Sequence, residues 1–594
     1  MWLPGSQHVG LPAKNRFMKI LLVHPTDSAA DGPWAEDKWS LAVDLGWSGR
    51  NFYERQTERL GYRVVSIYDL LEHQQHRRRM REILDAGLGQ LVDSESVDWW
   101  EVFSVQPYQR LEQIMLLSVL AEQIPDHAEL VATRPHSALP ALTLLLNREI
   151  RSFSAESRTN RQGSLGRYLK AASILRLPQL AEIALDKWDT DYRLRRHVSR
   201  APTKSSEPAF LLPSSYVNVS RAQAAYAQML PHRRFLLVVT RRNGRLQKLP
   251  GNVEVRSLAS YASRPSRALA REQADLLATW RKMQSGPFTT NPVVGVANNL
   301  HALDGFPSFL QRGLGIREAW RQVFARETIA GVLSGDEYNP FTRLPILLAR
   351  SRKLRTVFCD HGALNMSFGI RGTCSDTYLA RGDMARDYLV EWCGLSPDKV
   401  VVGGPRDCSD LAPTSGGERD WIVFYSEAYE LSLGRTEVLY EEVLPELCSL
   451  ARQTNRRVVV KLHPFESHRM RKALVDNVLS GEQRSLVDLR EGPMTADLFE
   501  RAWFSVTVES SVAVECAAKE VPCFLLSWFD ASWYDYGKQY AKFSAACPLA
   551  SPEAIRGIPQ LLEQFHVTET TRRGLQTSIS PEDLESVLAG RRPS

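Results

Sequence analysis

The stretch "RRVVVKLHPFESH" (Arg456–His468) carries the strongest signal for the fold of this 594-residue chain. Three successive valines predict a strand that is buried on both faces, as strands of parallel sheets are. Pro464 ends this strand, because proline cannot donate a ladder hydrogen bond. His463 precedes the proline and is therefore held extended at the strand tip. The tip either only terminates the strand or places His463 and Lys461 against a ligand.

Apolar, strand-like runs alternate with amphipathic, helix-like runs along the whole chain. This alternation is typical of α/β proteins with mostly parallel sheets. The expected strands are 19–25, 63–70, 128–135, 208–221, 233–242, 292–299, 329–340, 355–362, 376–382, 399–406, 421–430, 458–464, 484–492, 503–511 and 521–527. They form three series, and a segment of linker-like composition at 407–420 separates the last two.

Four ranges follow from these series. Residues 1–17 are expected to be a disordered extension, and residues 18–200 an N-terminal Rossmann-like subdomain with a polar, basic, helical insertion. Residues 201–410 continue the N-terminal region with a second Rossmann-like part. Residues 411–594 form a C-terminal Rossmann-like domain.

Composition limits the function classes. The chain is 43% hydrophobic and 24% charged, with a net charge of +6. This excess is small, and basic residues are not interleaved with aromatic ones, so nucleic acid is not an expected partner. The eight cysteines lie between Cys359 and Cys547 without zinc spacing, which indicates reduced thiols in a cytoplasmic protein. The longest apolar run, 138–146, is too short to cross a bilayer, and residues 1–17 lack a signal-peptide pattern.

Two basic clusters stand out locally, "HQQHRRRMR" (His73–Arg81) and "RLRRHVSR" (Arg193–Arg200). The favoured interpretation of each is a helix face in contact with water. The alternative is docking to an anionic membrane surface or an acidic polymer, which would place the chain at the inner face of the membrane.

Polar side chains follow three strands of the last series. Ser426 and Glu427 come after the first of them, Lys461 and His463 end the second, and Ser510 belongs to the "ESS" that ends the third. In an open parallel sheet, ligands bind beyond the carboxyl ends of the strands. We therefore expect these residues to converge on one crevice.

The segment "ESSVAVECAAKEVP" places Ser510 and Ser511 between a strand and a helix. Serine is a favoured helix N-cap, and one serine is enough for that role. The free N–H groups and the positive dipole end of a helix start also favour a phosphate, which the second serine makes more plausible. At the strand tip, His463 could donate a hydrogen bond to phosphate or act as a general acid, and Lys461 would add positive charge.

Two of these motifs together resemble a known family. "VVVKLHP" (Val458–Pro464), followed later by "VESSVAVECAAKEVPCFLL" (Val508–Leu526), is similar to the C-terminal half of bacterial GT-B glycosyltransferases of surface-polymer synthesis. The nearest members are capsule Kdo transferases, sialyltransferases and CDP-glycerol glycerophosphotransferases, which pair an HP motif with an SS motif around the donor phosphates. "DKVVVGGPRD" (Asp398–Asp407) resembles the segment that ends the GT-B N-terminal domain. The resemblance extends from Ile329 to Ser527.

This resemblance implies a GT-B-like fold, with two Rossmann-like domains facing a cleft and an enlarged N-terminal region. It implies a nucleotide-sugar donor, CMP- or UDP-linked, on residues 411–594, with neither cofactor nor metal. The donor residues implied or predicted in this way are Ser426, Glu427, Lys461, His463, Pro464, Ser510, Ser511 and, at the ribose, Glu515.

Candidates on the acceptor side are less specific. In "CDHG" (Cys359–Gly362), either Asp360 or His361 could be the general base, although the family usually has an acid where His361 stands, and Asp360 could be only a turn residue. The other candidates are the acids Asp336 and Glu337, which a polar turn also explains, and Gly46 and Gly49 of a glycine loop.

The leading hypothesis is an inverting, metal-independent glycosyltransferase that acts on a surface polysaccharide or glycolipid. In it the acceptor hydroxyl attacks the donor, and His463, Lys461 and the "ESS" N–H groups stabilise the departing phosphate. The alternatives are a CDP-alditol phosphotransferase, which would attack phosphorus with the same elements, and a non-catalytic GT-B scaffold that binds a glycan.

Overall fold

A computed structural model describes residues 18–25, 27, 39–153, 207–241, 244–246, 248–263, 266–359, 373–405, 418–529 and 536–592. The chain divides into two compact units. The first comprises Met1–Arg78, Gln113–Ser154 and Ser409–Leu575, and the second comprises Arg79–Glu112, Ala155–Cys408 and Gln576–Ser594. Among the described residues, no helix is both long and apolar enough to cross a membrane.

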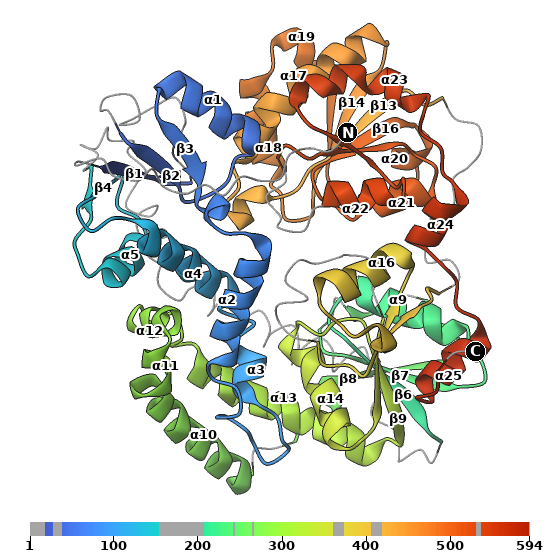
Figure 1. The fold of residues 1–594 in the computed structure, drawn as a ribbon. Helices are drawn as coiled ribbons and strands as arrows, with labels where there is room; N and C mark the ends of the chain where they lie inside the picture. The colour runs from blue at the N-terminus through green and yellow to red at the C-terminus, as the bar shows by residue number, and fades with distance from the viewer. Residues whose placement is uncertain are drawn as a thin grey trace. The chain divides into compact units, whose positions relative to one another are not determined.

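The first unit contains a five-stranded sheet near the N-terminus, in blue to cyan in Figure 1. All neighbouring strands are parallel and run in the order β3-β2-β1-β4-β5. The strands are β1 (Lys19–Val23), β2 (Leu41–Asp44), β3 (Arg63–Ser66), β4 (Glu129–Ala132) and β5 (Arg151–Ser152). The helices of this part are α1 (Arg50–Leu60), α2 (His73–Asp85), α4 (Tyr108–Gln123) and α5 (Leu139–Leu146), of which α2 and α4 each pass from one unit to the other.

The first unit also contains a six-stranded parallel sheet, in the order β15-β14-β13-β16-β17-β18. Its strands are β13 (Trp421–Tyr425), β14 (Arg457–Lys461), β15 (Val487–Arg490), β16 (Ala502–Thr507), β17 (Cys523–Leu526) and β18 (Cys547–Leu549). The helices are α17 (Thr436–Gln453), α18 (His468–Val478), α19 (Gly481–Arg484), α20 (Asp497–Glu500), α21 (Val512–Ala518), α22 (Tyr536–Lys542), α23 (Ile558–Leu562) and α24 (Glu569–Leu575). One hydrophobic core joins this sheet to the five-stranded one, from Leu21 and Trp47 to Val460 and Phe529.

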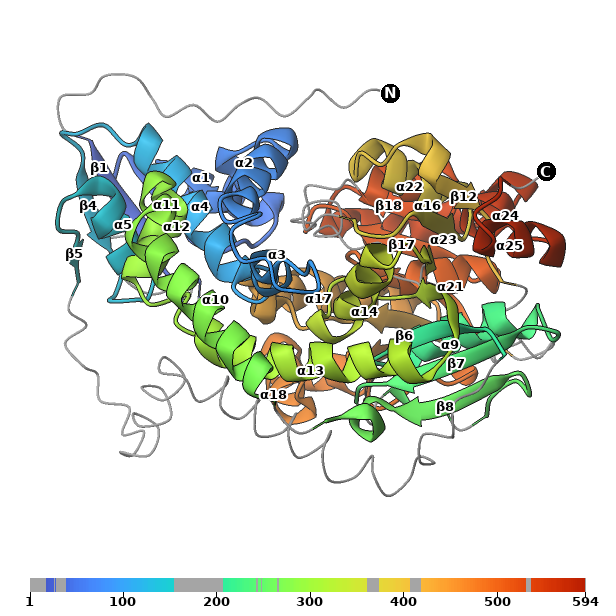
Figure 2. The same cartoon turned by 90° about the horizontal axis from the view of Figure 1, so that it is seen from below.

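The second unit is built on a seven-stranded parallel sheet in the order β12-β11-β10-β9-β6-β7-β8. Its strands are β6 (Ala209–Ser214), β7 (Arg234–Val239), β8 (Val253–Ser257), β9 (Ile329–Ser334), β10 (Arg355–Cys359), β11 (Thr377–Ala380) and β12 (Val400–Val402). The helices are α3 (Trp99–Phe103), α9 (Val217–Gln228), α10 (Arg267–Ser285), α11 (Pro287–Thr290), α12 (Pro292–Asn299), α13 (Phe306–Arg326), α14 (Pro340–Ser351), α16 (Asp383–Asp387) and α25 (Pro581–Leu588). Figure 2 shows α10 to α13 in green. Trp280 of α10 stacks on Phe306 of α13, with 4.1 Å between the ring centroids.

The expected α/β class with parallel sheets is confirmed, and each of the three strand series forms its own Rossmann-like sheet. The compact units do not follow the expected ranges. The five-stranded sheet shares its unit with residues 409–575, whereas it was expected to belong with residues 201–410. Residues 79–112 belong to the second unit, and so does the chain end with α25 (Figure 1). Leu584 and Val587 of α25 lie in the core of the seven-stranded sheet. The expected extension 1–17 and the insertion before 207 lie outside the described residues.

The expected strand at 292–299 is wrong, since these residues form helix α12. The Asn291 side chain accepts hydrogen bonds from the backbone N–H groups of Val293 and Val294, at 3.1 and 3.2 Å. Pro292 then occupies the first helical position, where its missing N–H costs nothing. The cap and the proline outweigh the strand preference of the three valines.

Candidate functional site

The six-stranded sheet has a switch point at β13. The chain steps outward from β13 through β14 and β15 and then returns to the other side of β13 with β16. Loops that leave neighbouring strands in opposite directions open a crevice at the carboxyl edge, where such sheets bind ligands. Ser426 follows β13, His463 follows β14 and Ser510 follows β16, so the structure brings these predicted residues to one edge at three adjacent strands.

Glu466 lies at the centre of this edge and was not predicted from the sequence. Its buried carboxylate accepts hydrogen bonds from the His463 backbone N–H at 2.6 Å, from Ser426 Oγ at 2.8 Å and from Arg471 Nε at 2.5 Å. Arg471 also binds both carboxylate oxygens of Glu430 at 2.8 Å. Glu466 therefore fixes the backbone that carries His463. The available signal was an acid three residues after the histidine, where it can return to the backbone of a tight turn.

The His463 ring has a defined hydrogen-bonding direction. Nδ1 accepts a hydrogen bond from the Phe465 N–H at 3.2 Å, so the neutral ring carries its hydrogen on Nε2. Burial lowers the pKa of His463, and Glu466 only partly opposes this. At neutral pH the side chain is thus a neutral donor through Nε2, and this geometry favours a hydrogen bond to an anion over a permanent positive charge.

Lys461 is turned into protein backbone. Its Nζ donates to the carbonyl oxygens of Leu462 at 2.7 Å and Gly492 at 2.8 Å, and the residue is 5% exposed. Burial lowers the pKa of Lys461, and the negative charge of Glu466 partly opposes this shift. In this position Lys461 holds the β14 tip to the loop after β15, and its predicted contact with phosphate stays a prediction. Pro464 is exposed beside it.

Glu427 and Ser510 join the tips of β13 and β16. Burial raises the pKa of the Glu427 carboxyl, and a hydrogen bond with the Ser510 side chain opposes the rise. Ser511 occupies the N-cap position of α21, but its hydroxyl makes no cap hydrogen bond. Glu515 is exposed in the same helix. The Ser511 hydroxyl therefore does not cap the helix, and the Glu515 carboxylate lies at the surface of α21.

The carboxyl edge of the five-stranded sheet is filled by protein rather than open. Arg435 donates to both carboxylate oxygens of Asp44, at 2.9 and 3.2 Å, and to the backbone oxygens of His24, Pro25 and Asp27, at 3.0, 2.5 and 2.6 Å. Arg435 is 1% exposed and Asp44 is fully buried. An arginine from the six-stranded part thus occupies the place where a Rossmann-like sheet commonly receives a ligand.

The two glycines predicted for the acceptor side belong to this packing. A Cβ at Gly46 would lie 2.4 Å from the Leu433 carbonyl oxygen, and one at Gly49 would lie 2.8 Å from that of Trp528. Gly49 also has a φ of +83°, which side chains rarely adopt. Close packing inside the first unit accounts for both glycines, and their contact with an acceptor stays a prediction.

Two histidines next to this edge are expected to make the stability of the first unit pH-dependent. Burial, followed by Arg134 and Arg435, lowers the pKa of His24 to about 4, and burial, followed by His24 and Arg134, lowers that of His136 to about 4. Their ring centroids lie 5.3 Å apart. Both pKa values lie below the ordinary histidine value of about 6.5. Between pH 4 and about 6.5 the unfolded chain therefore binds protons that the folded unit does not bind.

We expect the free energy of unfolding of the first unit to fall as the pH falls through about 6.5 towards 4. Replacing His24 and His136 with glutamine is expected to flatten this dependence, whereas replacing the exposed His127 leaves it unchanged. Urea denaturation across this pH range measures the slope. An equal slope in the double variant and the parent would contradict the assignment.

The acids predicted for the acceptor side are buried in the second unit. Asp336 accepts hydrogen bonds from the N–H groups of Tyr338 and Asn339, at 2.8 and 3.1 Å. Glu337 is fully buried and accepts from the Tyr378 hydroxyl at 3.0 Å and the Cys374 N–H at 3.2 Å. The Asp336 bonds shape the turn between β9 and α14, and the Glu337 bonds hold that turn to Cys374 and to Tyr378 of β11. The acceptor role of both acids stays a prediction.

Several predicted features lie outside the described residues. These are Asp360 and His361, the linker residues 407–417 and the basic cluster Arg193–Arg200. The other basic cluster is part of helix α2, which buries His76 and Met80 and exposes Arg78 and Arg81. That pattern fits the favoured interpretation of an amphipathic helix with a charged outer face.

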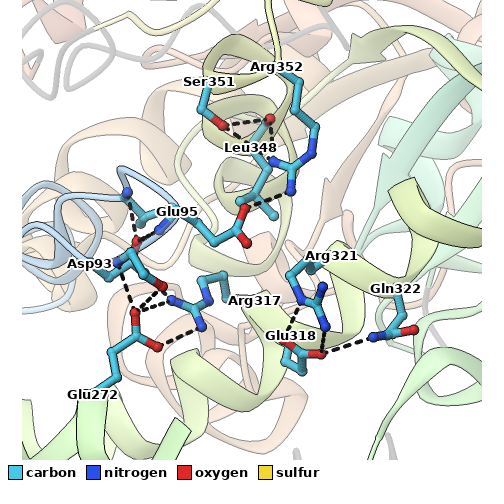
Figure 3. A network of polar contacts seen from close by, with 12 residues as sticks. Asp93, Glu95, Glu272, Arg317, Glu318, Arg321, Gln322, Leu348, Ser351 and Arg352 are labelled. Carbon is cyan, nitrogen blue, oxygen red and sulfur yellow. Dashed lines mark hydrogen bonds and ion pairs between the residues drawn. The ribbon is translucent and has the colours of Figure 1, made fainter. Parts of the chain in front are cut away.

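A depression of about 810 Å³ lies in the second unit, between the loop 90–95 and helices α10 and α13. Figure 3 shows its charged side chains bonded to one another. Arg317 pairs with Asp93 at 2.7 Å and with Glu272 at 2.9 Å, and Arg352 pairs with Glu95 at 2.6 Å. The network therefore ties the loop to the helices.

No family model matches the sequence, and no curated protein matches it. Among solved structures, the chain is similar to S. aureus MnaA determined with UDP, with 12% identity, a TM-score of 0.41 and coverage of 65% of this chain and 99% of that one. It is similar to a glycosyltransferase from Rickettsia africae, with 9% identity, a TM-score of 0.34 and coverage of 66% of this chain and 95% of that one. It is also similar to the wall teichoic acid polymerase TagF, with 11% identity, a TM-score of 0.35 and coverage of 72% of this chain and 98% of that one. At these TM-scores the similarities carry no argument about activity.

Proposed function

We propose that the chain is a glycosyltransferase of the GT-B type that transfers a sugar from a nucleotide-activated donor to a surface polysaccharide or glycolipid. The observation that carries this proposal is the meeting of Ser426, His463 and Ser510 at the switch point of the six-stranded sheet. The expected donor is CMP- or UDP-linked, and the reaction is expected to be inverting and to need no metal.

His463 and the "ESS" segment have distinct proposed roles. The Nε2–H of His463 donates to a donor phosphate, and Glu466 positions the histidine through its backbone N–H. The N–H groups at Ser510 and Ser511 add further donors, and Glu515 holds the ribose. Such preoriented donors stabilise the negative charge that develops on the departing nucleotide.

The remaining roles are proposed from the sequence alone. Asp360 or His361 removes the proton from the acceptor hydroxyl, and residues 201–410, with Asp336 and Glu337, face the acceptor. The chain would work in the cytoplasm at the inner face of the membrane. A CDP-alditol phosphotransferase would use the same phosphate contacts, so mass analysis of the products from CMP-, CDP-, UDP- and GDP-linked donors separates sugar transfer from alditol phosphate transfer.

Nucleotide binding tests the proposal first. A nucleotide at 100 times its Kd is expected to add about 2.7 kcal/mol to the free energy of unfolding, visible as a rise in Tm. His463→Ala is expected to weaken this binding about tenfold or more, because a hydrogen bond to a charged group contributes about 1.5–3 kcal/mol. His463→Gln keeps an N–H donor and is expected to lose less.

The matched control is His468→Ala, five residues further along the chain at the start of α18. It is expected to bind nucleotide like the parent. If no nucleotide raises the Tm of the parent chain, or if His463→Ala binds as tightly as His468→Ala, the proposed donor site is wrong.

A further inference from the structure

The seven-stranded sheet of the second unit has a switch point of its own, between β6 and β9. The chain steps outward from β6 through β7 and β8 and then returns to the other side of β6 with β9. The loops that follow β6 and β9 therefore leave in opposite directions, an arrangement that opens a ligand crevice at the carboxyl edge of such sheets. The segment "SSY" (Ser214–Tyr216) joins β6 to α9 at this point, much as "ESS" stands between β16 and α21, and the proposed function gives it no role.

Buried hydroxyl groups fix the loop after β6 to the loop after β7. Ser215 Oγ lies 2.6 Å from Thr240 Oγ1. Ser220 Oγ donates to the Gly244 carbonyl oxygen at 2.5 Å and lies 2.7 Å from Ser214 Oγ. All four hydroxyl-bearing side chains are buried. Because buried hydrogen bonds hold both loops, the side chains that these loops carry to the surface have defined positions.

Two side chains from these loops, Tyr216 after β6 and Arg241 after β7, contact each other at the surface. Tyr216 is 43% exposed and Arg241 is half-buried. Arg241 Nη1 donates to the Tyr216 hydroxyl at 3.2 Å. The guanidinium carbon lies 5.8 Å from the Tyr216 ring centroid and 5.2 Å from that of Phe341, in the first turn of α14. Arg241 therefore bridges the starts of α9 and α14, the two helices that follow the switch-point strands.

The chemistry of these groups fits a sugar that carries an acid group. An exposed tyrosine ring offers a flat apolar face to the C–H groups of a pyranose, and its hydroxyl adds a polar contact. A guanidinium held in place pairs with a carboxylate or a phosphate through two parallel hydrogen bonds. The positive end of the 12-residue helix α9, whose N-cap is Tyr216, also favours an anion. The carboxylate of Asp336, in the loop after β9, is buried and already accepts hydrogen bonds from two backbone N–H groups.

We propose that Tyr216, Arg241 and the start of α9 form a binding site for a pyranose that carries a carboxylate or phosphate group. Arg241 pairs with the acid group, and the Tyr216 ring packs on the sugar. As a binding site of the second unit, the inference stands without the transferase activity. As the assignment of an acidic acceptor, it rests on the proposed function.

Ligand-observed NMR titration of the full chain with glucuronic acid, glucose 6-phosphate and glucose tests the proposal. At least one of the two acidic sugars is expected to bind about tenfold more tightly than glucose, because hydrogen bonds between charged groups are the stronger kind. The tighter of the two identifies the acid group that Arg241 binds. Arg241→Gln is expected to remove the preference for the acidic sugar. Tyr216→Ala is expected to weaken the binding of all three sugars, whereas Tyr216→Phe keeps the ring and most of the binding.

The matched control is Arg326→Gln at the last residue of α13, an exposed arginine of the same unit, and it is expected to leave sugar binding unchanged. His463→Ala is expected to leave it unchanged as well, since His463 belongs to the first unit. The Tm of each variant, expected to equal that of the parent chain, shows that the variant is folded.

The proposal is overturned if the parent chain binds glucose as tightly as both acidic sugars, or if Arg241→Gln keeps the preference that Arg326→Gln keeps. Loss of the preference in His463→Ala would overturn it too, because the acid group would then occupy the donor site. So would a nucleotide-dependent rise in Tm that Arg241→Gln abolishes and His463→Ala retains, because this edge would then hold the nucleotide. If the parent chain shows no such rise but still prefers an acidic sugar, the donor site alone is wrong.

Discussion

Replacing Arg435 with leucine is expected to lower the free energy of unfolding of the first unit by about 3–5 kcal/mol, the cost of leaving a buried charge without its partner. The substitution strips Asp44 of its ion pair in a fully buried place and leaves three backbone carbonyl oxygens without their donor. Asp44 would retain the Gly46 N–H and the Tyr53 hydroxyl, at 3.1 and 3.0 Å, which do not neutralise it. Native-state proteolysis, read out by peptides of the first unit, measures the change.

The control is Arg457→Leu, which removes an exposed arginine from β14 of the same unit and is expected to change the free energy of unfolding by no more than about 0.5 kcal/mol. Adding Asp44→Leu to Arg435→Leu is expected to recover part of the loss, because the uncompensated charge goes with it. An Arg435→Leu variant as stable as the control would show that Arg435 does not fix the five-stranded sheet to the six-stranded one.

The sequence was sufficient for the features that repeat locally. Alternation of apolar strands and amphipathic helices predicted parallel α/β sheets, and "VVVKLHP" correctly placed β14 and its tip. It failed for four strands and at one helix cap. The strands β2, β5, β8 and β18 escaped prediction, and Asn291 with Pro292 turned a valine-rich segment into α12.

The residues of the candidate site also fall into those that the sequence predicts and those that it does not. Ser426, His463 and Ser510 could be predicted because each ends a recognisable strand, and parallel strands end at one edge. Arg435 could not, since its importance depends on partners that only the fold brings near. Glu466 offered only a local signal, an acid three residues after the histidine, and its hydrogen bond from Ser426 depends on the fold. Arg435 and Asp44 are separated by 391 residues in the chain. Lys461 was predicted to contact a phosphate, but its ammonium donates to backbone carbonyl oxygens. A lysine at a strand tip gives no sign in the sequence of which partner it will bind.

Replacing Arg317 with leucine is the second substitution expected to cost about 3–5 kcal/mol, here in the second unit. Its side chain is 4% exposed and pairs with the fully buried Asp93 and with Glu272 (Figure 3). Burial alone would raise the pKa of Glu272, but hydrogen bonds from Arg317 and Ser94 outweigh it and lower the pKa to about 2. The pair therefore contributes stability above about pH 4.5 that is lost as the pH falls towards 2.

Arg321→Leu is a closely matched control, since Arg321 lies one turn further along α13, is 40% exposed and pairs only with Glu318 of its own helix among the described residues. Such an exposed pair contributes about 0–1 kcal/mol, so the two variants should differ in unfolding free energy by at least about 2 kcal/mol. Native-state proteolysis of each full-length variant, followed through the peptides released from α10 and α13, measures this difference. Because Arg317 joins the loop at Asp93 to both helices, its loss should expose cleavage sites in residues 90–98 first. Equal protection of that loop in the two variants would mean that the aromatic packing around Trp99, and not the ion pairs, holds it in place.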